Sequence, residues 1–196
     1  MKKTILSIVV FLSLAIGAQA QTGSILVYGN VGFNTNKNGG VPDVTNAATT
    51  GSFRLNLGLG YQFNNNWTAG ITGGYNYSDV GYADIKNYHA GAFLRNSMHM
   101  AGIFSCYTQL DIGYQGQTVS SQTLANASKA NGFYATLAPV ISADVKNGFA
   151  LNFAIGGLDY SMLKTKGAGE SQSTFGLTFG QEVSVGISKN FGGKSH

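Results

Sequence analysis

Apolar residues recur at every second position over most of the chain beyond residue 20. The pattern is strictest in residues 52–63, where the apolar positions are Phe53, Leu55, Leu57, Leu59, Tyr61 and Phe63. The positions between them carry small or polar side chains such as Asn56 and Gly58. Because side chains alternate between the two faces of a strand, this segment predicts a β-strand with one apolar face. It is also longer than the ~5–6 residues usual for strands of soluble proteins.

The same alternation predicts seven further strands. Their apolar faces run over Ile25 to Phe33, Trp67 to Tyr77, Tyr88 to Leu94, Leu110 to Tyr114, Phe133 to Ile141, Phe149 to Ile155 and Val183 to Phe191. The fifth strand, expected at Met100 to Tyr114, has the weakest pattern. Three sites predict irregular pairing: Pro139 has no N–H to donate, the apolar parity slips at Gly156-Gly157, and a similar slip is expected near Gly180-Gln181.

The connections between these strands alternate in length. Long polar stretches are expected at Asn34 to Gly51, Ser78 to Asn87, Gln115 to Ala130 and Ser161 to Gln172. Short ones are expected at Asn64 to Asn66, Asn96 to His99 and Lys146 to Gly148. Tight turns on one side and loops on the other are typical of a chain that crosses a membrane as a meander. The sequence therefore predicts an all-β fold, an eight-stranded antiparallel up-and-down transmembrane β-barrel.

A water-soluble barrel or sandwich would instead turn its apolar face inward. Two features oppose that alternative. The polar faces of the strands are built mainly of Gly, Asn, Thr, Ser and Gln, whereas a face exposed to water normally carries Lys and Glu. Aromatic residues also gather at the strand ends, for example Trp67 and Phe149 beside short turns and Tyr88 and Phe133 towards long loops. Two aromatic girdles indicate two membrane interfaces.

The N-terminus has the pattern of an export signal. Lys2 and Lys3 precede an apolar run from Ile5 to Ile16, and Ala18-Gln19-Ala20 forms an A-x-A cleavage site. We interpret residues 1–20 as a signal peptide cut before Gln21 and residues 21–196 as the barrel domain. An N-terminal membrane anchor is the alternative, but the run is shorter than the ~20 residues that a spanning helix needs.

Composition bears on the surroundings and the partners of the chain. Only 10% of residues are charged, which suits a wall facing lipid better than a soluble secreted protein. The formal net charge of +4 falls to +2 without Lys2 and Lys3, so the basic balance does not predict a nucleic-acid partner. Cys106 is the single cysteine and has no intramolecular disulfide partner.

Several segments resemble the small outer-membrane β-barrel proteins of Gram-negative bacteria, of OmpA/OmpX-type architecture, known as the outer membrane protein beta-barrel domain family. They are residues 23–30, 137–139 and 155–160, and the likeness extends over residues 21–196. Residues 183–191 are similar to the signal read by the outer-membrane insertion machinery, with Phe191 as its terminal aromatic residue, although Gly192 to His196 follow it. The resemblance implies an outer-membrane location, contact with membrane lipids and lipopolysaccharide, and assembly by that machinery.

The candidate functional residues are the charged residues whose position in the alternation places them on the inner face of the barrel. Arg54, Asp111, Asp159 and Glu182 are expected at similar height in the half of the barrel near the long loops, and Arg95 and Asp144 near the short turns. Since side chains fill the interior of an eight-stranded barrel, these groups are interpreted as a structural salt-bridge network. A catalytic or proton-conducting role is the alternative.

The predicted function is non-enzymatic, with a packed lumen and a role in envelope integrity or in adhesion through the long loops. His89, His99 and His196 have no nucleophile motif around them, and no spacing predicts a metal or a cofactor. The main alternative is an enzyme that deacylates or acylates lipid or lipopolysaccharide. A small diffusion channel is disfavoured because eight strands leave little open lumen.

Overall fold

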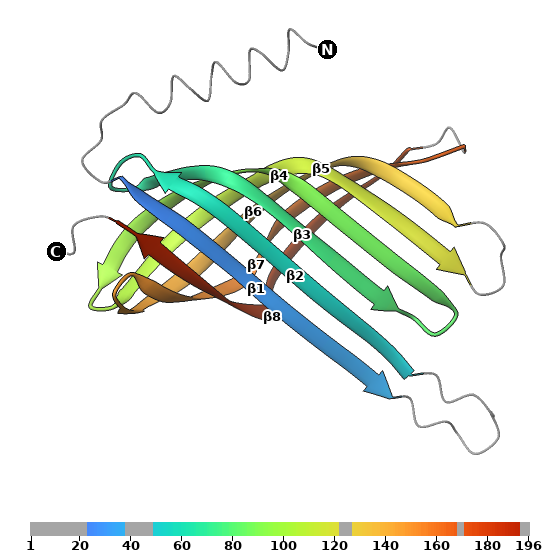
Figure 1. Cartoon of the computed structure of the whole chain (residues 1–196), viewed down its shortest axis with the longest axis horizontal. Coiled ribbons are helices and arrows are strands. Elements are labelled where there is room, and N and C mark those ends of the chain that lie inside the picture. Colours follow the sequence, from blue (N-terminus) through green and yellow to red (C-terminus); the bar gives the residue numbers. More distant parts are fainter. Residues whose placement is uncertain (1–22, 38–48, 122–126, 168–170, 193–196) are drawn as a thin grey trace, which may run out of the picture.

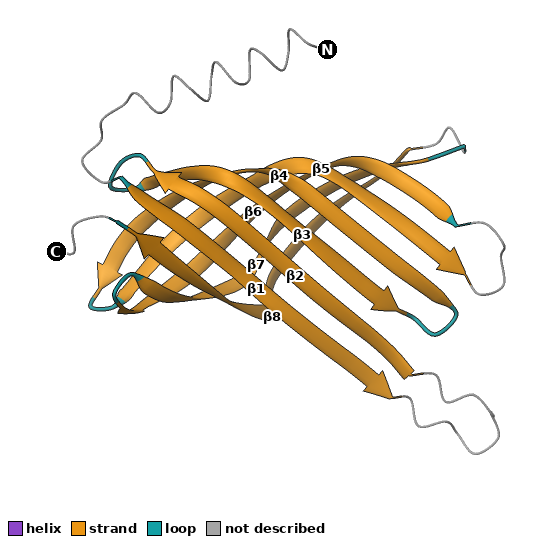
Figure 2. Ribbon diagram, viewed as in Figure 1, coloured by secondary structure: helices purple, strands orange, loops and turns teal. Residues whose placement is uncertain are grey.

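The computed structural model is a single closed barrel of eight antiparallel strands in sequence order (Figures 1 and 2). The strands are β1 (Ser24–Lys37), β2 (Thr49–Gln62), β3 (Trp67–Asp79), β4 (Ala83–Ala101), β5 (Phe104–Ser121), β6 (Ser128–Lys146), β7 (Phe149–Thr165) and β8 (Ser171–Phe191). The all-β, eight-stranded up-and-down fold predicted from the alternation is confirmed.

The structure describes residues 23–37, 49–121, 127–167 and 171–192. The predicted signal peptide, the connection at 38–48 and the tail beyond Gly192 lie outside this part. Within it, no helix is long and apolar enough to span a membrane.

One end of the barrel, here called the turn end, carries connections 63–66, 102–103 and 147–148 together with the start of β1 and the end of β8 (Figure 1). The opposite end is called the loop end. The last short connection is a two-residue Asn147-Gly148 turn with φ of 53° and 75°. Positive φ at both central residues is the geometry of a type I′ hairpin turn, so the Asn-Gly pair accounts for this sharp reversal.

The predicted lengths of several connections are wrong. The stretch Ser78–Asn87 is mostly strand, and only 80–82 connects β3 to β4, so this loop-end connection is shorter than 63–66 at the turn end. Likewise, most of Gln115–Ala130 belongs to β5 and β6. The backbone ladders continue through these polar residues, with Asp79 opposite Asp84 and Thr118 opposite Lys129. Because polar side chains lie on both faces of the strands here, their sequence pattern resembles that of a loop.

The short connection expected at Asn96–His99 is also wrong, because these residues lie inside β4 and the reversal comes at Gly102-Ile103. Met98 and Met100 extend the outward row of β4 and are 56% and 60% exposed. The fifth strand accordingly begins at Phe104 rather than Met100. Gly102, with φ of 61°, is the residue that allows the reversal here.

Two of the three predicted irregularities occur where the sequence placed them. The β6–β7 register shifts between Leu137 and Val140, around Pro139, and the β7–β8 register shifts between Ala154 and Gly156. Gly156 has φ of 114°, a conformation that a bulge can require and that glycine tolerates. The third, a parity slip near Gly180-Gln181, is wrong, because the exposed apolar residues Leu177 and Phe179 before this point and Val185 and Ile187 after it keep the same parity.

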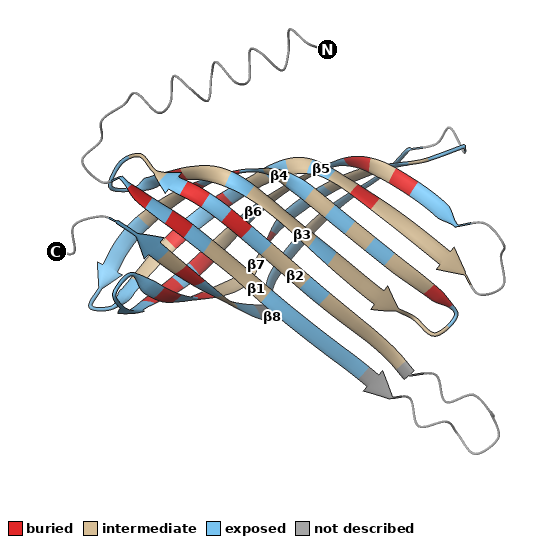
Figure 3. Cartoon of the chain, in the orientation of Figure 1, coloured by how far each residue is buried: buried red, intermediate tan, exposed pale blue. Residues whose placement is uncertain are grey.

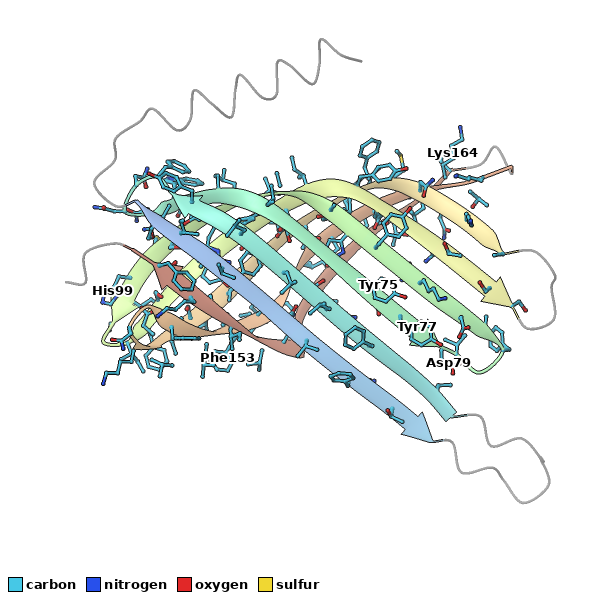
Figure 4. The ribbon with its side chains drawn as sticks, viewed as in Figure 1. Tyr75, Tyr77, Asp79, His99, Phe153 and Lys164 are labelled. Carbon is cyan, nitrogen blue, oxygen red and sulfur yellow. The ribbon has the colours of Figure 1, made fainter. Side chains whose placement is uncertain are left out.

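The outer face of the barrel is apolar along every strand. Representative exposed fractions are 55% for Leu57, 63% for Ile71, 53% for Ile112 and 57% for Ile187. Exposed aromatic residues lie towards both ends of this face, with Trp67 and Phe149 near the turn end and Phe133 near the loop end. Figure 4 labels Tyr75 and Tyr77 towards the loop end. The predicted direction of the two strand faces is confirmed.

The buried side chains gather mainly in the half of the barrel nearest the turn end (Figure 3). Phe93 is 3% exposed, and its ring lies where a Cβ atom on Gly60 or Gly70 would stand, at 2.6 and 2.7 Å. Gly60 and Gly70 are register partners, and Gly70 is also paired with Phe93. Glycine pairs on neighbouring strands thus make room inside a narrow barrel for an inward aromatic ring.

Candidate functional site in the barrel lumen

A cluster of large side chains closes the lumen towards the turn end. Its members point inward from three strands, because they share inward parity in β1, β4 and β5, and we call it the Arg95 cluster: Tyr28, Phe93, Arg95, Tyr107, Gln109 and Asp111. Arg95 is 4% exposed, Gln109 7% and Tyr107 8%. Such burial of an arginine requires polar partners inside the barrel.

Gln109 supplies those partners. Its Oε1 accepts hydrogen bonds from Arg95 Nε at 2.9 Å and from Arg95 Nη2 at 2.6 Å. Its Nε2 donates to Tyr28 OH at 2.9 Å and to the Asp111 carboxylate at 2.9 and 3.1 Å. The amide therefore connects the guanidinium to the carboxylate, and the two charges are linked through one neutral side chain.

Aromatic rings enclose the guanidinium of Arg95. Its Cζ lies 3.9 Å from the centroid of the Tyr107 ring, 4.8 Å from that of Tyr28 and 5.8 Å from that of Phe93. Tyr28 and Phe93 contact each other edge to face, with centroids 5.2 Å apart. Cation–π attraction in a site without water is worth about 2 kcal/mol or more, so the rings stabilise the buried charge.

Above the Arg95 cluster the lumen is hollow. A cavity of about 520 Å³ lies between the Arg95 cluster and the loop end, and Arg54, His89, Thr136 and Asp159 are among the residues that line it. His89 packs edge to face on Tyr134 with centroids 5.3 Å apart. The expectation of a packed lumen thus describes the half towards the turn end, while the other half has room for small molecules.

The predicted inward charges are not all brought together. Arg95 and Asp111, which the sequence placed at different heights, belong to one cluster through Gln109. Asp159 accepts a hydrogen bond from Thr136 Oγ1 at 2.9 Å in the cavity wall. Arg54 also lines the cavity, and no described side chain forms an ion pair with it. Asp144 is exposed near the turn end, and the side chain of Glu182 lies outside the described part of the structure.

Sequence reasoning missed the bridging role of Gln109. Parity alone places Gln109, Tyr107 and Asp111 on the inner face, but it cannot tell which inward residues meet across the barrel. The signal that could have identified the pair is the register: Arg95 is directly opposite Gln109 in the β4–β5 ladder. Among the described residues, no three His, Cys, Asp or Glu side chains are grouped so that they could hold a metal ion.

The wall of the barrel is incomplete along one strand pair. β1 and β8 are paired over five residue pairs, from Ile25 opposite Phe191 to Gly29 opposite Ile187. In Figure 1, β8 lies beside β1 only near the turn end and then continues along β7. We call the remaining edges, residues 30–37 of β1 and 171–186 of β8, the β1–β8 seam. The cavity reaches this seam, since Asn30, Ser184 and Gly186 are among its lining residues.

Comparison with known proteins identifies the fold and goes no further. No protein-family model matches the sequence, and no curated protein sequence matches it. Among solved structures, Neisserial surface protein A is 13% identical with a TM-score of 0.55, covering 86% of this chain and 97% of that one. The outer-membrane protein OprG from Pseudomonas aeruginosa is also 13% identical with a TM-score of 0.55, covering 88% of this chain and 97% of that one. The chain has the fold of the eight-stranded outer-membrane barrels.

Proposed function

We propose that this chain is an integral protein of the bacterial outer membrane with a non-enzymatic role, in envelope structure or in interactions at the loop end of the barrel. Residues 1–20 direct export, and the outer-membrane insertion machinery reads the last strand up to Phe191. In the membrane the outer face contacts lipid, and the loop end contacts lipopolysaccharide. The observation that carries this proposal is the apolar outer face.

That face is unsuited to water. Leu57, Ile71, Ile112 and Val185 are each more than half exposed on four different strands, at 55%, 63%, 53% and 53%. Soluble monomers rarely expose connected apolar patches larger than a few hundred Å². A belt that encircles the whole barrel is matched by the hydrocarbon of a bilayer.

The interior supports a non-enzymatic role. Two of its buried polar residues, Arg95 and Gln109, are bonded to each other, and Gln109 is also bonded to Tyr28 and Asp111, so they stabilise the barrel from within. They lie beneath the cavity and close the lumen at the turn end, where a channel would need to be open. Activity through the surface of the loop end is then the role best matched to this scaffold.

The test is to express the full chain in a Gram-negative host and to separate the membranes by density. We expect the protein in the outer-membrane fraction, with heat-dependent migration on gels and an N-terminus that begins at Gln21. Recovery as a soluble periplasmic protein would contradict the membrane location. Release of fatty acid from purified lipopolysaccharide by the refolded protein would contradict the non-enzymatic role.

A further inference from the structure

The β1–β8 seam differs from every other strand junction in the barrel. Its five residue pairs compare with at least twelve in each of the other seven ladders. At the point where the ladder ends, Gly186 lies close to β1: a Cβ atom there would be 3.1 Å from Gly29 O and 3.5 Å from Asn30 Cβ. The two strands therefore touch at Asn30 and separate beyond it.

The seam lies at the depth of the apolar outer face. Val31 and Phe33 on the β1 side are 58% and 77% exposed, and Leu177, Phe179 and Val185 on the β8 side are 69%, 68% and 53% exposed. Backbone N–H and C=O groups that face hydrocarbon without partners cost several kcal/mol each. At this depth the strand edges need contact with the water of the lumen or with a polar group bound there.

The cavity behind the seam has two unlike walls. Polar side chains line it on the side of β1 to β4, namely Asn30, Arg54, Asn56, Thr72 and His89. On the side of β6 to β8, a run of small or apolar residues lies beside polar ones that include Thr136, Asp159 and Ser184; the run consists of Ala138, Val140, Ala154, Gly156, Gly157 and Gly186. A cavity with polar groups on both sides and an apolar stretch next to the seam offers contacts to both ends of an amphiphile.

Arg54 is the charged lining residue that lacks a described partner, whereas the carboxylates of Asp111 and Asp159, which also line the cavity, accept hydrogen bonds from Gln109 and Thr136. It stands next to the seam, because its register partner in β1 is Gly32, which belongs to the unpaired edge. It is exposed, lines the cavity, and forms no ion pair with a described side chain. Asn56, two residues along the same inner face, donates its hydrogen bond to Asn30 Oδ1 at 2.8 Å and leaves the guanidinium to other partners. An anionic headgroup is the ligand that such a guanidinium binds best.

We propose that the lumen binds a single-chain anionic amphiphile of the fatty-acid type, with its carboxylate on Arg54 and its chain leaving the barrel through the β1–β8 seam into the bilayer. This proposal rests on the proposed membrane location. The carboxylate leaves water and contacts the guanidinium of Arg54 and the polar lining residues. The chain stays in contact with the apolar residues that flank the seam.

The experiment uses the full mature chain, refolded into nanodiscs of zwitterionic lipid and exposed to palmitate with a photoreactive group midway along its chain. Mass spectrometry then locates the labelled residues. We expect labelling concentrated at residues 30–35 and 184–187. Arg54→Gln should lower labelling about tenfold, because the neutral amide cannot form the charge-assisted hydrogen bonds that a guanidinium makes to a carboxylate. Arg54→Lys should retain most of it, and Lys164→Gln, a cation lost at the loop end, should leave it unchanged.

Two results would overturn the proposal. Labelling spread evenly over the outward residues of all strands and insensitive to Arg54→Gln would mean that palmitate meets the barrel only as bulk lipid. Displacement of the probe by inorganic phosphate as effectively as by unlabelled palmitate would mean that a small anion is bound and that the seam plays no part. A wild-type chain that fails to insert into the discs would instead contradict the proposed membrane location, which separates the two failures.

Discussion

The half of the barrel near the turn end is packed and has all eight strand junctions formed, whereas the half near the loop end is hollow and open along one strand pair. The same strands run through both halves, so secondary structure does not account for the difference. Side-chain size does: Tyr28, Phe93, Arg95 and Tyr107 meet in the first half, while asparagine, threonine, serine and glycine line much of the second.

This contrast indicates that the pairing of β1 with β8 and the packing of side chains in the lumen are linked. Where inward rings meet across the lumen, the β1–β8 ladder is formed, with Tyr28 opposite Ser188. Where no rings meet, β8 leaves β1 after Gly186. Dispersion contacts across the lumen hold the first and last strands together in one half and are too few to do so in the other.

The largest effect should come from removing the buried cation. Arg95→Ala leaves the buried Gln109 Oε1 without its donor and opens a void among three rings; a buried acceptor left unsatisfied costs about 1–3 kcal/mol, and the void adds to that cost. Arg54→Ala, in the hollow half, should cost less than about 1 kcal/mol, as expected for an exposed charge. Urea unfolding of the refolded proteins in micelles measures both. Equal free energies of unfolding would remove the distinction between the halves.

A smaller effect is expected from adding one methyl group at a glycine. A Cβ atom on Gly70 would lie 2.1 Å from Leu59 O and 2.5 Å from Gly60 Cα, so Gly70→Ala must displace backbone and should cost about 1–3 kcal/mol. Gly176, in the loop-end half of β8, has nothing within 4 Å of the same position, so Gly176→Ala should be nearly neutral. The same unfolding measurement applies, and a costly Gly176→Ala would show that this half is packed as tightly as the other.

The sequence predicts the faces of the strands better than their ends. Alternation identified the outward rows because lipid-facing and inward positions differ in chemistry at every residue. It failed at Ser78–Asn87 and Asn96–His99, where side chains on both faces are polar or mixed and only the backbone ladder continues the strand. Parity also identified Arg95 and Asp111 as inward. Their link through Gln109 depends on distances between strands, and the alternation within a single strand carries no information about those distances.

The β1–β8 seam can be tested by two pairs of cysteines in a Cys106→Ser background. Asn30→Cys with Gly186→Cys should form a disulfide on mild oxidation, because the Cβ atoms there are 3.5 Å apart and disulfides span ~3.5–4.5 Å. Gly32→Cys with Ser184→Cys, the next inward pair if the ladder continued, should cross-link far more slowly. Migration on non-reducing gels after heating reports both. Equally rapid cross-linking of the two pairs would mean that the seam closes in solution.

The last prediction is an absence of conductance. In planar bilayers the refolded chain should carry no large, steady current. The hollow half alone would conduct, but the path must also pass the Arg95 cluster, where Arg95, Gln109 and Tyr107 are each more than nine-tenths buried. The direct bonds of Gln109 to Arg95, Tyr28 and Asp111 hold these side chains together inside the lumen. Bilayers without protein are the control. A stable pore that passes small sugars would mean that the turn end is open, and the contrast between the two halves would then be false.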